Sequence, residues 1–182
     1  TTGTGAYAFG IYNNGSTNTT TVSGSITTAG YAGDGIYNNG STNTTTVSGS
    51  IKTSGKQAYG ITIWGDNNTT NMSGSITTSG DQSYGIYQVG DNNTINMSGS
   101  ISSASDTFAK GIEISGDNNT TTMSGSISAA GTDAYGIYNN GDNNNIKQHQ
   151  ATTSSNKQQE TTTTTHTTAR YTGYSIIDIY IY

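Results

Sequence analysis

The sequence predicts an all-β protein, a parallel β-solenoid of about six coils of 25 residues, followed by a C-terminal strand. Three observations support this prediction. A Gly-Ile pair recurs every 25 residues with one added residue before Gly111, a Ser-Gly-Ser-Ile segment recurs with the same period, and an asparagine holds a fixed place in each repeat. A period of about 20–50 residues is typical of repeat architectures, in which each unit buries its apolar side chains against the next unit.

Three columns of apolar residues run through the repeats. The segments that carry them are four to eight residues long, rich in β-branched and aromatic types, and bounded by Gly, Asn and Asp, without a helical apolar pattern. Each repeat is therefore predicted to form about three short strands joined by tight turns. The columns are Ile11, Ile36, Ile61, Ile86, Ile112 and Ile137; Val22, Val47, Met72, Met97 and Met123; and Ile26, Ile51, Ile76, Ile101 and Ile127.

The asparagine column lies just before the second strand of each repeat. An asparagine at a solenoid corner can hydrogen-bond to the backbone and to its equivalents in the coils above and below. Asparagine is also common in turns, but its presence in every repeat favours a structural ladder. The predicted ladder consists of Asn18, Asn43, Asn68, Asn93, Asn119 and Asn144.

Composition and charge exclude several functions. The chain has 182 residues with six Lys and Arg against eleven Asp and Glu, a net charge of −5, no Cys and no Pro. We expect no nucleic-acid partner, because binding phosphates needs clustered basic side chains. No apolar run approaches the ~20 residues that span a membrane, and no thiolate metal site or disulfide can form. The sequence predicts no cofactor.

Both ends of the repeat array differ from its middle. The chain opens in mid-coil without a capping sequence, so we expect either further sequence upstream or docking of another copy on the open strand edges. We divide the chain into solenoid repeats over 1–145, a Thr/Gln-rich linker or irregular coil over 146–170, and a strand over 171–182. In that strand Ile177, Ile179 and Ile181 share one face, which could cap the last coil or add to a neighbouring molecule in self-association.

Two outward columns are candidate binding sites. Asp66, Asp91, Asp117 and Asp142 recur in Gly-Asp-Asn-Asn turns, where solvated carboxylates are the simpler interpretation and calcium is a weaker candidate, because it needs six to eight oxygens. Threonine pairs two residues apart share the outer face of the second strand and are similar to the flat arrays of ice-binding solenoids, although Thr also favours exposed strand positions. The possible binding face comprises Thr19, Thr21, Thr44, Thr46, Thr120 and Thr122.

The fifth repeat is irregular. Its extra residue near Ser105–Asp106 predicts a bulge, and Lys110 and Glu113 stand where several other repeats carry tyrosine, which we interpret as a solvated surface irregularity. A partial tyrosine ladder, with Trp64 one turn away, could contact carbohydrate or protein, although packing between the rings is the simpler interpretation. The ladder comprises Tyr12, Tyr37, Tyr87 and Tyr138.

The repeat resembles a known class of sequence. The segments AYGIYNNGDNN at 134–144 and GDNNTINMSGSISS at 90–103 resemble repeats of bacterial autotransporter-type passengers and related surface adhesins. The resemblance covers residues 1–145. It implies a right-handed β-helix at the bacterial cell surface or outside the cell, serving adhesion or acting as a stalk.

Catalysis has no evident basis in the sequence, because two Glu and one Arg stand far apart and no Ser-His-Asp arrangement is suggested. We therefore expect a non-enzymatic extracellular rod, structural or adhesive, that associates with itself into a fibre and could contact a host surface or glycan. A ligand-binding face, for ice or for glycan, is the alternative.

Overall fold

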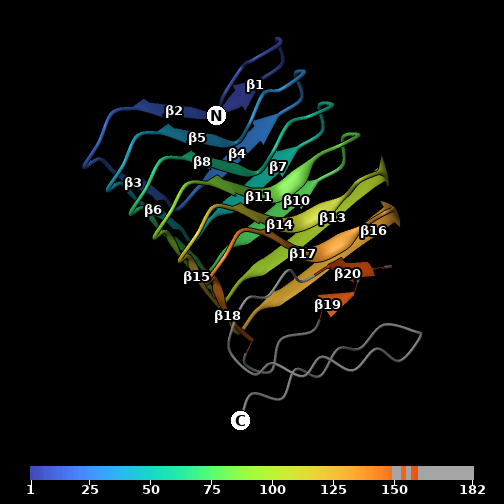
Figure 1. The fold of residues 1–182 in the computed structure, drawn as a ribbon. Coiled ribbons are helices and arrows are strands. Elements are labelled where there is room, and N and C mark those ends of the chain that lie inside the picture. The colour runs from blue at the N-terminus through green and yellow to red at the C-terminus, as the bar shows by residue number, and fades with distance from the viewer. Residues whose placement is uncertain (149–152, 155–156, 160–182) are drawn as a thin grey trace.

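The computed structural model describes residues 1–148, 153–154 and 157–159, and these residues form a parallel β-solenoid (Figure 1). Each coil contributes one strand to each of three sheets, which we name A, B and C in the order in which the chain visits them. The predicted fold class is therefore confirmed, and coils one to six are the successive strand triplets β1–β3 to β16–β18.

The strands stack in sequence order along the solenoid axis. Sheet A comprises β1 (Thr2–Gly3), β4 (Ser25–Thr28), β7 (Ser50–Thr53), β10 (Ser75–Thr78), β13 (Ser100–Thr107), β16 (Ser126–Thr132) and β19 (Thr153–Ser154). Sheet B comprises β2 (Ile11–Asn14), β5 (Ile36–Asn39), β8 (Ile61–Trp64), β11 (Tyr84–Val89), β14 (Lys110–Ser115), β17 (Tyr135–Asn140) and β20 (Lys157–Gln159). Sheet C comprises β3 (Thr19–Val22), β6 (Thr44–Val47), β9 (Thr69–Met72), β12 (Thr94–Met97), β15 (Thr120–Met123) and β18 (Asn145–Gln148).

The core consists mainly of the three apolar columns predicted from the sequence, with Ile11 only partly buried, and it also includes Ile63, Ile95 and Ile114. Equivalent residues pair in register from coil to coil, for example Ile36 with Ile61, Ile51 with Ile76, and Val47 with Met72. Their side chains are almost wholly buried and form one continuous cluster. Strands such as β3 and β4 alternate buried and exposed residues with the period of two that a half-buried strand requires, whereas in β8 the intervening Thr62 is also buried.

The glycine of each Gly-Ile pair is needed for this packing. A Cβ added to Gly35 would lie 2.3 Å from Ile51 Cγ2 and 2.6 Å from the carbonyl oxygen of Gly60, too close for any side chain. The backbone of sheet B therefore lies directly against the isoleucine column of sheet A, and the pair recurs because every coil needs the same close approach.

The repeat array continues past residue 145, where the sequence period ends. Strand β18 pairs with β15, β19 pairs with β16, and β20 pairs with β17. The predicted C-terminal strand over 171–182, with Ile177, Ile179 and Ile181, lies outside the described residues. No helix in the described part of the chain is long and apolar enough to cross a membrane.

Candidate functional site

The asparagine column forms a hydrogen-bonded ladder at the corner between sheets B and C. In each step the side-chain Oδ1 of one asparagine accepts a hydrogen bond from the backbone N–H of the asparagine one coil earlier, as from Asn43 N to Asn68 Oδ1 at 2.8 Å. The five steps measure 2.7–2.8 Å and join Asn18, Asn43, Asn68, Asn93, Asn119 and Asn144. These side chains occupy turn amides that the sheet hydrogen bonds do not reach, so this column supports the fold.

The aspartates of the Gly-Asp-Asn-Asn turns form a second ladder. The backbone N–H of Asp91 donates to Asp66 Oδ1 at 2.9 Å, and the same contact recurs at 2.7 Å from Asp117 to Asp91 and from Asp142 to Asp117. Each acceptor lies one coil before its donor, the reverse of the asparagine ladder. Among the described residues, no group of three or more His, Cys, Asp or Glu side chains is arranged to hold a metal ion. Calcium at this column stays a prediction.

The outer face of sheet B is aromatic. Tyr12 and Tyr37 stack with ring centroids 5.4 Å apart and an interplanar angle of 10°, and Tyr59 and Tyr84 stack at 4.8 Å and 13°. Trp64 meets Tyr87 edge to face at 6.3 Å. Tyr59 and Tyr84 belong to the tyrosine column that directly precedes Gly-Ile and that holds Lys110 in the fifth coil. The predicted tyrosine ladder did not include this column.

Lys110 and Glu113 lie within this aromatic face, and the interpretation as a solvated irregularity was wrong. Lys110 Nζ donates to Glu113 Oε2 at 2.6 Å, and the two side chains are only 11% and 13% exposed. Lys110 Nζ also lies 4.0 Å from the ring centroid of Tyr138 and 4.7 Å from that of Tyr84. The tyrosines of the coils above and below cover the pair, and cation–π attraction stabilises the ammonium group there.

The extra residue of the fifth coil forms the predicted bulge. The register between β13 and β16 shifts between Ala104 and Thr107. Thr107 Oγ1 then donates to Asp81 Oδ1 at 2.6 Å, and Asp81 forms an ion pair with Lys56 at 3.4 Å. The hydrogen bond from Thr107, together with Lys56, lowers the pKa of Asp81.

A buried carboxyl group lies at the start of the aromatic face. Asp34 is 4% exposed, and its carboxylate accepts hydrogen bonds from the Tyr59 backbone N–H at 2.8 Å and from Thr62 Oγ1 at 2.6 Å. Burial raises its pKa to about 6, because desolvation of the charged form outweighs the two hydrogen bonds. Nothing in the sequence singles out Asp34, because a lone acidic residue before Gly-Ile is typical of a turn.

The outer face of sheet C carries two columns of small polar side chains. The first is Thr at every coil from one to five, since Thr19, Thr44, Thr69, Thr94 and Thr120 pair in register. In the second column Thr21, Thr46 and Thr122 are separated by Asn71 and Asn96. The predicted threonines therefore all lie on one face, either exposed or half-buried, while Thr20, Thr45 and Thr121 between them point inward.

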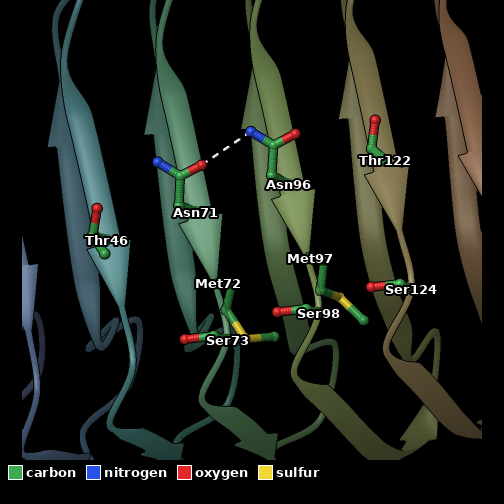
Figure 2. Close-up of a pocket in the computed structure, with 9 residues that line it drawn as sticks. All are labelled: Thr46, Asn71, Met72, Ser73, Asn96, Met97, Ser98, Thr122 and Ser124. Atoms are coloured by element: carbon green, nitrogen blue, oxygen red, sulfur yellow. Dashed lines mark hydrogen bonds between the residues drawn. The ribbon is translucent and has the colours of Figure 1, made fainter.

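A groove hollows this face where the second column changes from Thr to Asn (Figure 2). Its volume is about 300 Å³, and it crosses coils two to five. One side is lined by Thr46, Asn71, Asn96 and Thr122, the other by Ser73, Ser98 and Ser124, with Met72 and Met97 between the two rows. The lining contains no charged side chain.

The groove was not predicted, although the sequence carried a signal. Coils one and two have Val22 and Val47 in the core column of sheet C, whereas coils three to five have Met. Both columns therefore differ from the first two coils in coils three and four, while coil five combines Met123 with Thr122. The turn that follows is glycine for a steric reason. A Cβ on Gly99 would lie 2.0 Å from Gly74 O, so the backbone of the preceding coil leaves no room for a side chain in this turn.

Comparison of the chain with protein-family models, curated proteins and solved structures finds no significant match.

Proposed function

We propose that this chain is a non-enzymatic extracellular rod of the autotransporter-passenger or surface-adhesin kind, with a structural or adhesive role. One observation carries the proposal. On each sheet the outward side chains repeat in register along the axis, so that the fold produces long faces of equivalent groups rather than a single site of unlike residues. Faces of this kind suit contact with an extended or repetitive surface, such as a host surface or its glycans.

The two hydrogen-bonded ladders favour a mechanical role. The asparagine and aspartate ladders run in opposite directions along the rod, and each joins successive coils through side-chain-to-backbone hydrogen bonds. In a solenoid each coil contacts only its neighbours, so stability accumulates along the axis. Because each coil presents an edge equivalent to that of the next, the same contacts can also join coils of two molecules into a fibre.

Ice binding is a second candidate, and the unbroken threonine column of sheet C favours it. Ice binding requires a flat, regular array, which the first two coils offer through Thr19, Thr21, Thr44 and Thr46. The groove and its asparagines interrupt that array from coil three onward. Thermal hysteresis of a solution of the chain would favour ice binding. Its absence would refute ice binding, and the adhesive rod would remain as the proposed function.

The test combines imaging with an adhesion assay. We expect electron micrographs of the purified chain to show uniform narrow rods that lengthen with protein concentration. Beads carrying the chain should adhere to a glycan-bearing cell surface better than beads carrying Thr44→Lys/Thr69→Lys, a variant that charges one outer face and leaves the core intact. Compact particles without rods, or equal adhesion of the two bead types to every surface tried, would contradict the proposal.

A further inference from the structure

We propose that the groove on sheet C binds a neutral, extended oligosaccharide lying along the solenoid axis. This inference rests on the proposed adhesive function and names the ligand class of one face. The groove is the place where the repeat departs from its own pattern in two adjacent columns, Thr to Asn on the outside and Val to Met on the inside. A purely structural coil needs neither change, because coils one and two form the same sheet with Thr and Val.

The side chains of the groove match the chemistry of sugar hydroxyl groups. The amide of Asn96 donates through Nδ2 to Asn71 Oδ1 at 2.9 Å, which fixes the orientation of both amides. In the described structure, Asn96 Oδ1 then remains as an acceptor and Asn71 Nδ2 as a donor with no further protein partner. A sugar hydroxyl both donates and accepts, so it can bridge such a pair. The exposed hydroxyl groups of Ser73 and Ser98 form the opposite row.

The methionines belong to the core beneath the groove and offer almost no surface to a ligand. Met72 and Met97 lie between the asparagine and serine rows (Figure 2), but their side chains are only 1% and 2% exposed. Direct contact with a sugar therefore falls to the amide and hydroxyl groups of the two rows. A few convergent polar groups fix the orientation of the ligand in small-ligand sites, and about 300 Å³ is at the lower end of the volumes such sites have.

The spacing of the groups favours an extended chain over a single sugar. Asn71 and Ser73 of coil three recur as Asn96 and Ser98 in coil four, and neighbouring strands lie ~4.8 Å apart. One sugar ring of an extended glycan has a similar length, so successive rings can meet the same set of groups in successive coils. The groove crosses four coils, which gives room for more than one ring.

Other ligand classes fit the groove less well. Phosphate, sulfate and uronate groups are bound mainly by Lys and Arg, and no charged side chain lines the groove. An extended peptide would bind by adding a strand at a free edge. The strands under the groove offer none, because β6, β9, β12 and β15 each pair on both sides within sheet C. A neutral glycan requires neither a counter-charge nor a strand edge.

The test measures binding of neutral hexasaccharides to the full chain by saturation-transfer NMR and calorimetry. The neutral probes are cellohexaose, xylohexaose, mannohexaose and chitohexaose. Oligogalacturonate tests for an anionic oligosaccharide ligand, and an uncharged extended peptide tests for a peptide ligand. The variant Asn71→Thr/Asn96→Thr gives coils three and four the outer residue of coils one and two, so the fold is retained. The matched control, Asn14→Thr/Asn39→Thr, changes two exposed asparagines of sheet B.

We expect at least one neutral hexasaccharide to bind, and the Asn71→Thr/Asn96→Thr variant to bind it roughly tenfold more weakly, as loss of one to two hydrogen bonds implies. The Asn14→Thr/Asn39→Thr control should bind like the original chain. No binding of any neutral hexasaccharide up to about 1 mM, equal binding by both variants, or preference for the anionic oligosaccharide or the peptide would overturn the proposal.

Rod formation and bead adhesion by the Asn71→Thr/Asn96→Thr variant distinguish failure of the glycan groove from failure of the rod. If the Asn71→Thr/Asn96→Thr variant still forms rods and its beads still adhere, while the chain binds no neutral hexasaccharide, only the glycan groove is refuted. If neither rods nor adhesion are found, the proposed function is refuted, whether or not the chain binds a hexasaccharide.

Discussion

Gln88 is the least satisfied polar side chain among the described residues. It is 1% exposed, and neither its Oε1 nor its Nε2 has a hydrogen-bond partner. Ile63 and Ile114 hold the equivalent positions in the coils on either side. We expect Gln88→Ile to raise the free energy of unfolding by about 1–3 kcal/mol, because it removes two buried unsatisfied groups and completes an isoleucine column. Urea denaturation measures this effect.

The control for that substitution is Thr77→Ile, which adds a similar apolar side chain at an exposed position of β10. Its effect on the free energy of unfolding should stay within about 0.5 kcal/mol. A destabilised Gln88→Ile variant would show that the amide of Gln88 contributes a favourable interaction, for instance through an internal water molecule.

Thr42 adopts a backbone conformation that suits asparagine better. Its φ is 62°, and the equivalent residues Asn67, Asn92 and Asn118 adopt φ of 57–58°. A β-branched residue is strained in the left-handed region, whereas Asn tolerates it. We expect Thr42→Asn to stabilise the chain by about 1 kcal/mol and Asn92→Thr to destabilise it by a similar amount. Thermal unfolding of the two variants checks the pair, and shifts of the same sign would contradict the argument.

Asp34 makes the stability of the solenoid depend on pH. Its folded pKa is raised from 3.8 to about 6, so between these values the folded state holds a proton that the unfolded state has released. Stability from this group is therefore fully present below about pH 4 and is lost as the pH rises through about 6, a change of about 3 kcal/mol.

In Asp34→Asn this loss should be absent, while the other carboxyl groups titrate as before. The difference in the free energy of unfolding between the two proteins, measured from pH 4 to pH 7, isolates Asp34. A constant difference across that range would mean that Asp34 is not desolvated in the folded state.

At the scale of the structural element, the asparagine ladder is the most sensitive feature. Asn68 Oδ1 is the acceptor for the buried backbone N–H of Asn43. Asn68→Ala leaves that amide without a partner, so we expect a destabilisation of about 2–4 kcal/mol. The exposed Asn39, whose side-chain Nδ2 donates to Asn14 Oδ1 at 3.2 Å, is the matched control, and Asn39→Ala should cost less than about 0.5 kcal/mol.

Hydrogen exchange locates the effect of Asn68→Ala. The amide of Asn43 should lose protection selectively, because its acceptor is gone, whereas the amide of Asn93 keeps its bond to Asn119 Oδ1. Equal loss of protection at both amides would point to unfolding of the whole corner instead of a single broken step.

At the scale of the molecule, the solenoid should tolerate removal of a whole coil but not of part of one. Deleting residues 61–85 joins Gly60 to Ile86 and restores the Gly-Ile pair and every column. Because coils contact only their neighbours, we expect a folded, shorter rod whose urea m-value falls by roughly a sixth.

Deleting residues 61–72 removes about half a coil and shifts every later residue out of its column. This variant should lose its cooperative transition, which circular dichroism and urea titration would show. If both deletions unfold to the same extent, the stability of the chain is not a sum over neighbouring coils.

The sequence by itself determined the number and length of the coils, the residues that point inward, and the asparagine corner. These follow from periodicity, because a period of 25 residues with alternating apolar side chains places equivalent residues in register, as Ile36 and Ile61 demonstrate. The bulge near Ser105–Asp106 was also predictable, because one added residue in a strict period must be accommodated locally.

Only the tertiary structure decided how side chains meet across the corners and between neighbouring coils. The burial of Lys110 and Glu113 under tyrosine rings, the desolvation of Asp34, and the groove beside Met72 and Met97 all depend on contacts between coils. A repeat pattern predicts which way each side chain points. Its packing and solvent exposure depend on residues 25 positions away and on the neighbouring sheet. For that reason the columns were predictable from the sequence and the groove was not.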